Sequence, residues 1–121
     1  MESIIAAYKI PFCIVSAFIL FDVVTGFTGA ILEKRVSSSK MRDGLEHKIA
    51  FYLIWIFAFI VEVCSSALDI GFTIPCVLPV TVYVVATETV SILENICSMN
   101  PSIDKAKIFK IFENSNNVQD D

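Results

Sequence analysis

Residues 10–32 read IPFCIVSAFILFDVVTGFTGAIL, an apolar run whose only charge is Asp22. A helix needs about 20 consecutive apolar residues to cross a bilayer, so this run is long enough for one crossing. The apolar character already begins at Ile4, interrupted only by Lys9, and whether residues 1–9 belong to the span stays open. The run therefore predicts a membrane-spanning helix and not an element of a soluble core.

Two further apolar runs follow the first one. Residues 49–68 read IAFYLIWIFAFIVEVCSSAL with Glu62 as their only charge, and a third span is expected near 74–96, with two prolines at its entry. The composition agrees, since 55% of the 121 residues are hydrophobic and the mean hydropathy is +0.71. A soluble domain of this size cannot bury so much apolar surface. The sequence predicts an all-α integral membrane protein, a single domain over 1–121 with three transmembrane helices.

The basic residues predict the orientation of the spans. Five of them stand in the connection 33–48, whereas the link 69–73 has none and the tail 99–121 has three. The positive-inside rule makes the connection and the tail cytoplasmic and places the N-terminus and the second link outside. Within the tail, IDKAKIFKIFE at 103–113 is expected to form a short amphipathic helix at the membrane surface. The five basic residues of the connection are Lys34, Arg35, Lys40, Arg42 and Lys48.

Several functional classes find no support in the chain. The net charge of −4 and the mixed signs of the basic connection argue against a nucleic-acid partner. The four cysteines form no C-x-x-C pair and His47 is the only histidine, so we expect no metal site. Without a Gly-rich phosphate loop or a nucleophile elbow, we expect no catalytic residues and no cofactor.

Each predicted span nevertheless carries an acidic residue: Asp22, Glu62 or Glu88. A charge at a helix centre costs about 2.5–3.5 kcal/mol on insertion scales, so such groups usually face a bundle interior or water. In the third span the polar residues recur at helical spacing and share one face of roughly 100°, which Glu94 widens. This polar stripe consists of Thr81, Glu88, Ser91, Glu94 and Asn95. We expect it to lie between copies of the chain or against water, and the alternative is hydrogen bonding within one monomer.

The first span has a face of small and polar residues at the spacing i, i+3, i+4, i+7. Small residues let helix backbones approach closely in lipid, so this face and Glu62 of the second span are expected to pack helices together. For Asp22 and Thr25, a purely structural role and a functional one are both open. The residues of this face are Asp22, Thr25, Gly26 and Gly29.

Two segments carry a resemblance to a known family. FDVVTGFTGAILEKRVSSS at 21–39 has an acidic residue, a hydrophobic pair and T-G at the end of a span, followed by a basic, serine-containing connection. ATETVSILENI at 86–96 is similar to a pattern A-N-E-G-x-S-I-L-E-N, with Thr87 for Asn and Thr89 for Gly. Both resemble the toxin secretion/phage lysis holin family, and the likeness covers residues 20–112. The matching residues of the second segment are Ala86, Glu88, Ser91, Ile92, Leu93, Glu94 and Asn95.

The resemblance implies a function and a set of partners. Such a protein forms homo-oligomers in the cytoplasmic membrane, contacts membrane lipid and opens non-specific holes. A muralytic enzyme then reaches the wall and lyses the host, or a large toxin is exported, without required direct contact to the holin. The alternatives from the residues alone are a small ion- or proton-coupled transporter or channel subunit, which also uses membrane carboxylates, and a structural membrane adaptor.

Overall fold

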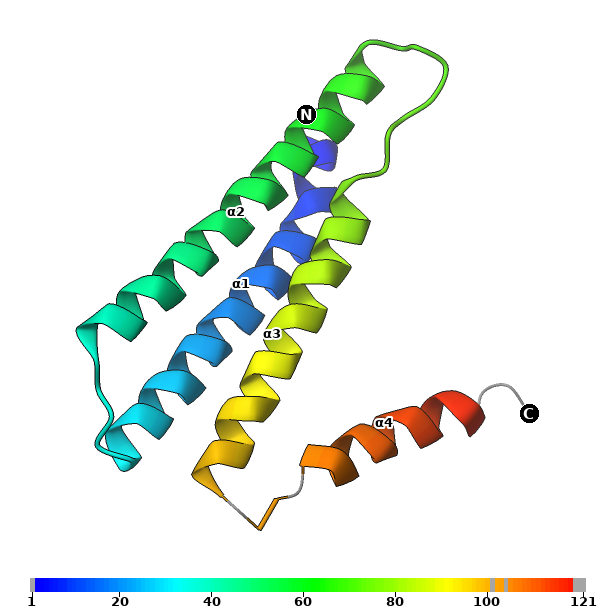
Figure 1. Cartoon of the computed structure of the whole chain (residues 1–121). Coiled ribbons are helices and arrows are strands. Elements are labelled where there is room, and N and C mark those ends of the chain that lie inside the picture. Colours follow the sequence, from blue (N-terminus) through cyan, green and yellow to red (C-terminus); the bar gives the residue numbers. More distant parts are fainter. Residues whose placement is uncertain (1, 101, 104, 119–121) are drawn as a thin grey trace.

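Three long helices lie side by side in the computed structural model, and a fourth helix leaves them at one end (Figure 1). The structure describes residues 2–100, 102–103 and 105–118. The helices are α1 (Glu2–Leu32), α2 (Ser38–Ala67), α3 (Val77–Met99) and α4 (Lys105–Val118). The first three are long and apolar enough to cross a membrane, which confirms the all-α fold with three candidate spans. The position of α4 agrees with the amphipathic segment expected at 103–113.

The first helix is longer than the run that predicted it. It begins at Glu2 and continues through Pro11, so the apolar residues before Ile10 extend the same helix. Proline removes one backbone hydrogen bond from a helix interior, and in a bilayer that loss is tolerated where neighbouring helices pack against it. Pro11 therefore marks neither the start nor the end of α1.

The second helix also begins earlier than expected. Ser37 has extended backbone angles (φ −129°, ψ 122°) and its side chain accepts a hydrogen bond from the Lys40 backbone N–H at 3.5 Å, which is an N-cap. Residues 38–48 are therefore helical and not part of a loop, because the cap precedes a stretch rich in good helix formers. The connection between α1 and α2 shrinks to 33–37.

The third helix is displaced toward the C-terminus relative to the range 74–96. It begins at Val77, with Pro79 in its first turn, where a proline costs no intrahelical hydrogen bond. It ends at Met99, because Asn100 is extended (φ −135°, ψ 97°) as expected for a residue that precedes a proline.

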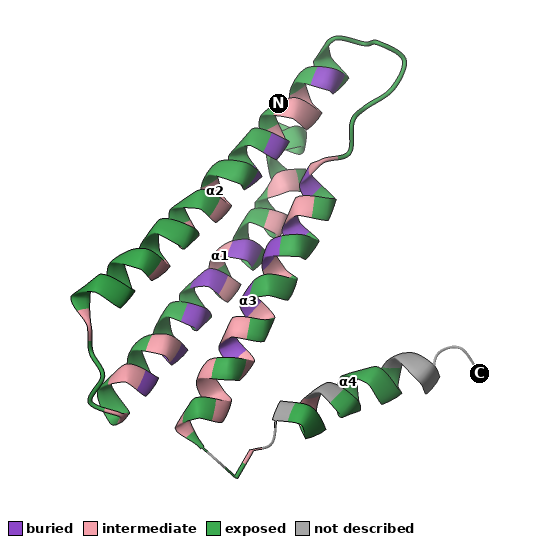
Figure 2. Ribbon diagram, viewed as in Figure 1, coloured by how far each residue is buried: buried purple, intermediate pink, exposed green. Residues whose placement is uncertain are grey.

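Buried residues lie along the faces that the helices turn toward one another (Figure 2). The apolar part of this interior consists of one cluster, Val15, Ile19, Trp55, Ala58, Val77 and Val84, together with the buried Ile92. The outward faces carry large apolar side chains in the open, such as Leu20 at 63% and Phe57 at 66% exposure. Apolar surface of this extent is suited to contact with lipid.

The backbones of α1 and α3 approach more closely than either approaches α2. A Cβ added to Gly26 would lie 3.4 Å from Asn95 Nδ2, and one added to Gly29 would lie 3.4 Å from Met99 Cγ. The second helix reaches its neighbours through long side chains instead. Its Trp55 Nε1 donates to Thr81 Oγ1 of α3 at 3.0 Å, and the Trp55 ring lies 5.2 Å from that of Phe12 on α1.

The glycine contact between α1 and α3 leads to a first prediction. Gly26→Ala should be tolerated, because its Cβ makes ordinary contact and alanine favours the helix by about 1 kcal/mol. Gly26→Leu should displace Asn95 and lower the free energy of unfolding by about 1–3 kcal/mol, a typical cost of overpacking. Denaturant unfolding in mixed micelles, followed by circular dichroism, measures both. Equal stability of the leucine variant and the wild type would mean that α1 and α3 do not meet at Gly26.

Candidate functional site

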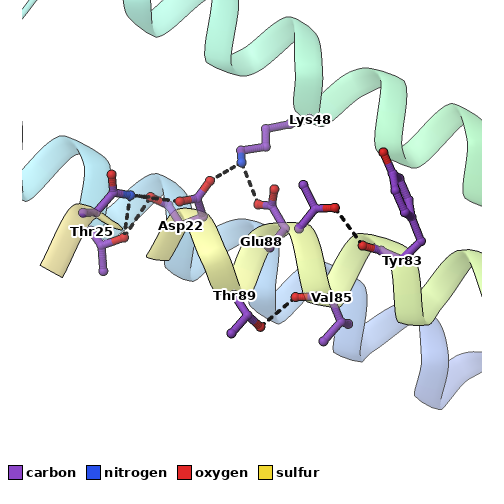
Figure 3. Close-up of polar contacts among 9 residues, drawn as sticks. Asp22, Thr25, Lys48, Tyr83, Val85, Glu88 and Thr89 are labelled. Carbon is purple, nitrogen blue, oxygen red and sulfur yellow. Dashed lines mark hydrogen bonds and ion pairs between the residues drawn. The ribbon is translucent and has the colours of Figure 1, made fainter. Parts of the chain in front are cut away.

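One lysine links all three apolar helices through two carboxylates (Figure 3). Lys48 of α2 donates a hydrogen bond to Glu88 Oε2 of α3 at 2.6 Å and another to Asp22 Oδ2 of α1. The three side chains are only 12%, 2% and 7% exposed, respectively. A single ammonium group is thus shared by two buried acids.

Two polar residues complete the surroundings of Asp22. Asn95 of α3 donates its Nδ2 to Asp22 Oδ1 at 2.9 Å and to Thr25 Oγ1 at 3.1 Å. The Thr25 hydroxyl in turn donates to the Asp22 backbone carbonyl at 3.1 Å. We call these five residues, Asp22, Thr25, Lys48, Glu88 and Asn95, the Lys48 cluster. Among the described residues, no buried side-chain nitrogen or oxygen lacks a hydrogen-bond partner.

The charges of the Lys48 cluster do not cancel when all its groups are ionised. Two carboxylates face one ammonium, which leaves one net negative charge between apolar helices. A buried ion pair contributes little net stability, but removing one partner leaves a buried charge and costs about 3–5 kcal/mol. Lys48 therefore matters most because, without it, two carboxylates would be buried side by side.

The polar stripe of α3 divides between the interior and the surface. Thr81, Glu88 and Asn95 turn toward the other two helices, and Thr81 accepts from Trp55 while donating to the Val77 carbonyl at 2.7 Å. Ser91 is half-buried and Glu94 is exposed. Within one chain, the inner part of the stripe thus meets α1 and α2.

The helix-packing residues predicted on α1 and α2 also fall in two places. Asp22 and Thr25 belong to the Lys48 cluster, and Gly26 and Gly29 lie against α3. Glu62 lies near the other end of the bundle, where its Oε1 accepts from the Val77 backbone N–H at 3.2 Å. It caps the start of α3, where a negative charge is favourable.

Two contacts of α3 concern positions that depart from the family pattern. Thr87 donates to the Tyr83 carbonyl at 2.9 Å, and Thr89 donates to the Val85 carbonyl at 2.7 Å (Figure 3). Both hydroxyl groups are therefore satisfied by their own helix. Threonine at these positions adds no polar group that a neighbouring helix must match.

Lys48 is the residue that sequence reasoning misses, because it stands in the basic connection 33–48, which the sequence predicts to be cytoplasmic. A signal for it does exist in the sequence. Lys48, Tyr52, Trp55 and Glu62 share one helical face, and Tyr52 and Trp55 also bond across to the other helices, Tyr52 donating to Ser16 Oγ at 3.0 Å. A base immediately before an apolar run, on the same face as the polar residues of that run, indicates a partner for the acids of the neighbouring spans.

A comparison with known families gives a match. The model of the bacteriophage holin family matches residues 1–115, which include α1, α2, α3 and most of α4. No curated protein and no solved structure matches the chain.

The second prediction concerns the ammonium of Lys48. Lys48→Met keeps the length of the side chain but leaves two carboxylates unpaired, and should lower the free energy of unfolding by about 3–5 kcal/mol. Lys40→Met, an exposed lysine on the same helix, is the matched control and should have little effect. Adding Asp22→Asn and Glu88→Gln to Lys48→Met should restore most of the loss. Unfolding in mixed micelles measures all four proteins, and equal stabilities of the two single lysine variants would contradict a buried ion pair.

Proposed function

Because this chain belongs to the bacteriophage holin family, we propose that it assembles with copies of itself and opens holes in the cytoplasmic membrane. The family is one of membrane pore formers and not of enzymes. Together with the three membrane-capable helices, family membership makes the chain a multi-pass membrane protein. The holes release a muralytic enzyme for lysis of the host cell, or export a large toxin, and neither cargo needs direct contact with the chain.

The observation that carries this proposal is a charged cluster inside helices that are otherwise apolar. Ionisable groups within membrane spans usually mark a water-filled path or a protein interior. In the single chain, the Lys48 cluster is enclosed by α1, α2 and α3 and is almost dry. In an assembly, the same groups can line a lumen, where water hydrates them and lowers the cost of their charge.

The loose attachment of α2 suggests how the chain passes from the closed state to the open assembly. Near the 33–37 connection, α2 is held to the other helices by the Lys48 side chain, and α1 and α3 are packed together more closely. Movement of α2 away from this pair uncovers Glu88 and Asp22. Our expectation that the polar stripe lies between copies or against water then applies to the open assembly, whereas in the closed state Glu88 of the stripe is paired with Lys48 of the same chain.

A small ion- or proton-coupled transporter is the alternative function. In the Lys48 cluster, two acids on different helices share one lysine. Such an arrangement also suits proton transfer within a membrane. The two proposals differ in what crosses the membrane. A hole passes a folded enzyme, and a transporter changes ion gradients without releasing protein.

The orientation is part of the proposal and gives a third prediction. Lys34, Arg35, Lys40 and Arg42 remain outside the Lys48 cluster, and by the positive-inside rule they support a cytoplasmic location for the 33–37 end of the bundle. Single cysteines at Ser3 and Ser102, in a chain whose four native cysteines are alanine, should differ in intact cells. A membrane-impermeant thiol reagent should label position 3 and not position 102. The reverse pattern would overturn the orientation.

The fourth prediction tests hole formation. Glu88→Leu removes the charge that a wet lumen would hydrate and leaves a neutral Asp22–Lys48 pair, so the closed state is favoured. In bacteria that also make a cytosolic muralytic enzyme, it should delay or abolish lysis at equal membrane protein level. Glu88→Gln should shift the timing less, and Val82→Leu on the exposed face of α3 should keep the normal schedule.

Other outcomes of this lysis experiment separate the functions. Normal timing with Glu88→Leu would mean that the carboxylate has no part in opening. Loss of ion gradients by the wild type, without release of the enzyme, would favour the transporter. In both cases, the amount of protein in the membrane must be shown to be equal.

A further inference from the structure

We propose that α4 binds the anionic headgroups of the leaflet at the C-terminal end of α3. This helix extends away from the three-helix bundle, and its side chains are mostly exposed (Figures 1 and 2). It follows Met99, the last residue of a membrane-capable helix, after residues 100–104. So short a tether keeps α4 within reach of the membrane surface, because an extended residue spans at most about 3.6 Å.

The described apolar side chains of α4 are largely uncovered. Ile111 is 65% and Phe112 is 55% exposed, and Ile108 is half-buried. At about 100° per residue, these three side chains fall within one arc of roughly 100°. Such a face in water is unfavourable, and the boundary between headgroups and acyl chains is the nearest apolar phase.

The charges of α4 favour an anionic surface over a neutral one. Lys107 lies beside the apolar arc and Lys110 on the opposite side, and both are exposed. When the apolar face enters the bilayer, lysine side chains at its edge can extend toward the headgroups. Glu113 is the acidic residue among the described side chains of this helix, and it also lies away from the apolar arc.

Basic residues also stand at the same end of the bundle, interspersed with Glu33, Asp43 and Glu46, and Arg35 is paired with Glu33. Lys34 and Arg35 lie in the connection between α1 and α2, and Lys40 and Arg42 lie in the first turns of α2. All four are exposed. Each basic residue near an anionic leaflet strengthens binding to the membrane about five-fold. Salt weakens this attraction, because it screens charges that lie more than a Debye length apart.

This inference requires the three helices to sit in a bilayer and does not require them to open a hole. A dye attached to α4 therefore tests it separately from lysis. Ser115 lies within the apolar arc and Asn114 lies on the polar side, and both are exposed. Each is changed to cysteine in the full chain, with the four native cysteines as alanine, and labelled with an environment-sensitive nitrobenzoxadiazole dye.

The labelled chains are reconstituted in vesicles of mixed phosphatidylglycerol and phosphatidylcholine, and in vesicles of phosphatidylcholine alone. In the mixed vesicles, the dye at Ser115→Cys should be blue-shifted and quenched by spin-labelled lipid, and the dye at Asn114→Cys should remain in water. In phosphatidylcholine or at high salt, the docked fraction should fall. Lys107→Gln should lower the ratio of docked to undocked α4 by roughly five-fold, and Lys110→Gln, on the side opposite the apolar arc, should lower it less. The matched control, Glu113→Gln, should not lower it.

Three results would overturn the proposal. A dye at 115 that stays in water in the mixed vesicles would mean that α4 does not enter the membrane surface. Equal burial in both lipids, unaffected by salt or by the lysine changes, would mean that anionic headgroups are not recognised. Burial that rises with the ratio of protein to lipid would make a second copy of the chain the partner of α4.

Discussion

The ammonium of Lys48 is the group on which the bundle depends, because it lets two acids share one dry interior. Lipid supplies no hydrophobic force between helices, so apolar spans associate through close packing and polar contacts. The pair α1–α3 uses close packing at Gly26 and Gly29. The attachment of α2 relies on side chains that extend across, with Lys48 near one end and Trp55 farther along.

The same arrangement explains how one sequence can serve a closed and an open state. A buried ion pair with one unbalanced charge is stable only while its partners stay together, and water can replace each partner. The apolar outer faces favour a chain that stays in lipid, whereas the Lys48 cluster favours hydration. On the function we propose, the chain must stay closed in the membrane and then open, and these opposing preferences are what each of the two states would use.

Sequence reasoning could predict the three helices, because a helix needs a minimum number of consecutive apolar residues to cross the hydrocarbon core. The runs around Phe18, Phe57 and Val84 are long enough. It could also predict that Glu88 and Asn95 share a face of α3, since spacing alone decides that. It did not predict their partner, because Lys48 stands in a stretch whose charge and serines suggest a connection between spans, and this outweighs the helical spacing that Lys48 shares with Tyr52 and Trp55. Nor could it predict the role of Glu62, because a carboxylate that caps another helix depends on how α2 and α3 are placed. The start of α2 was missed for a related reason: three serines suggest a turn, and only the Ser37 cap shows which of them precedes the helix.

In the function we propose, the interior around Lys48 is dry in the closed chain and wet in the open assembly. A cysteine at Thr81, which is 6% exposed and outside the ion pair, reports this directly. The cysteine is introduced into a chain without native cysteines, and its reaction with a charged, water-soluble thiol reagent is followed before and after the membrane begins to leak solutes. Val82→Cys, on the exposed face of α3, is the control. Position 81 should become reactive when leakage begins, and position 82 should stay unreactive in lipid. A position 81 that stays unreactive while the membrane is open would show that the interior around Lys48 does not become the lumen.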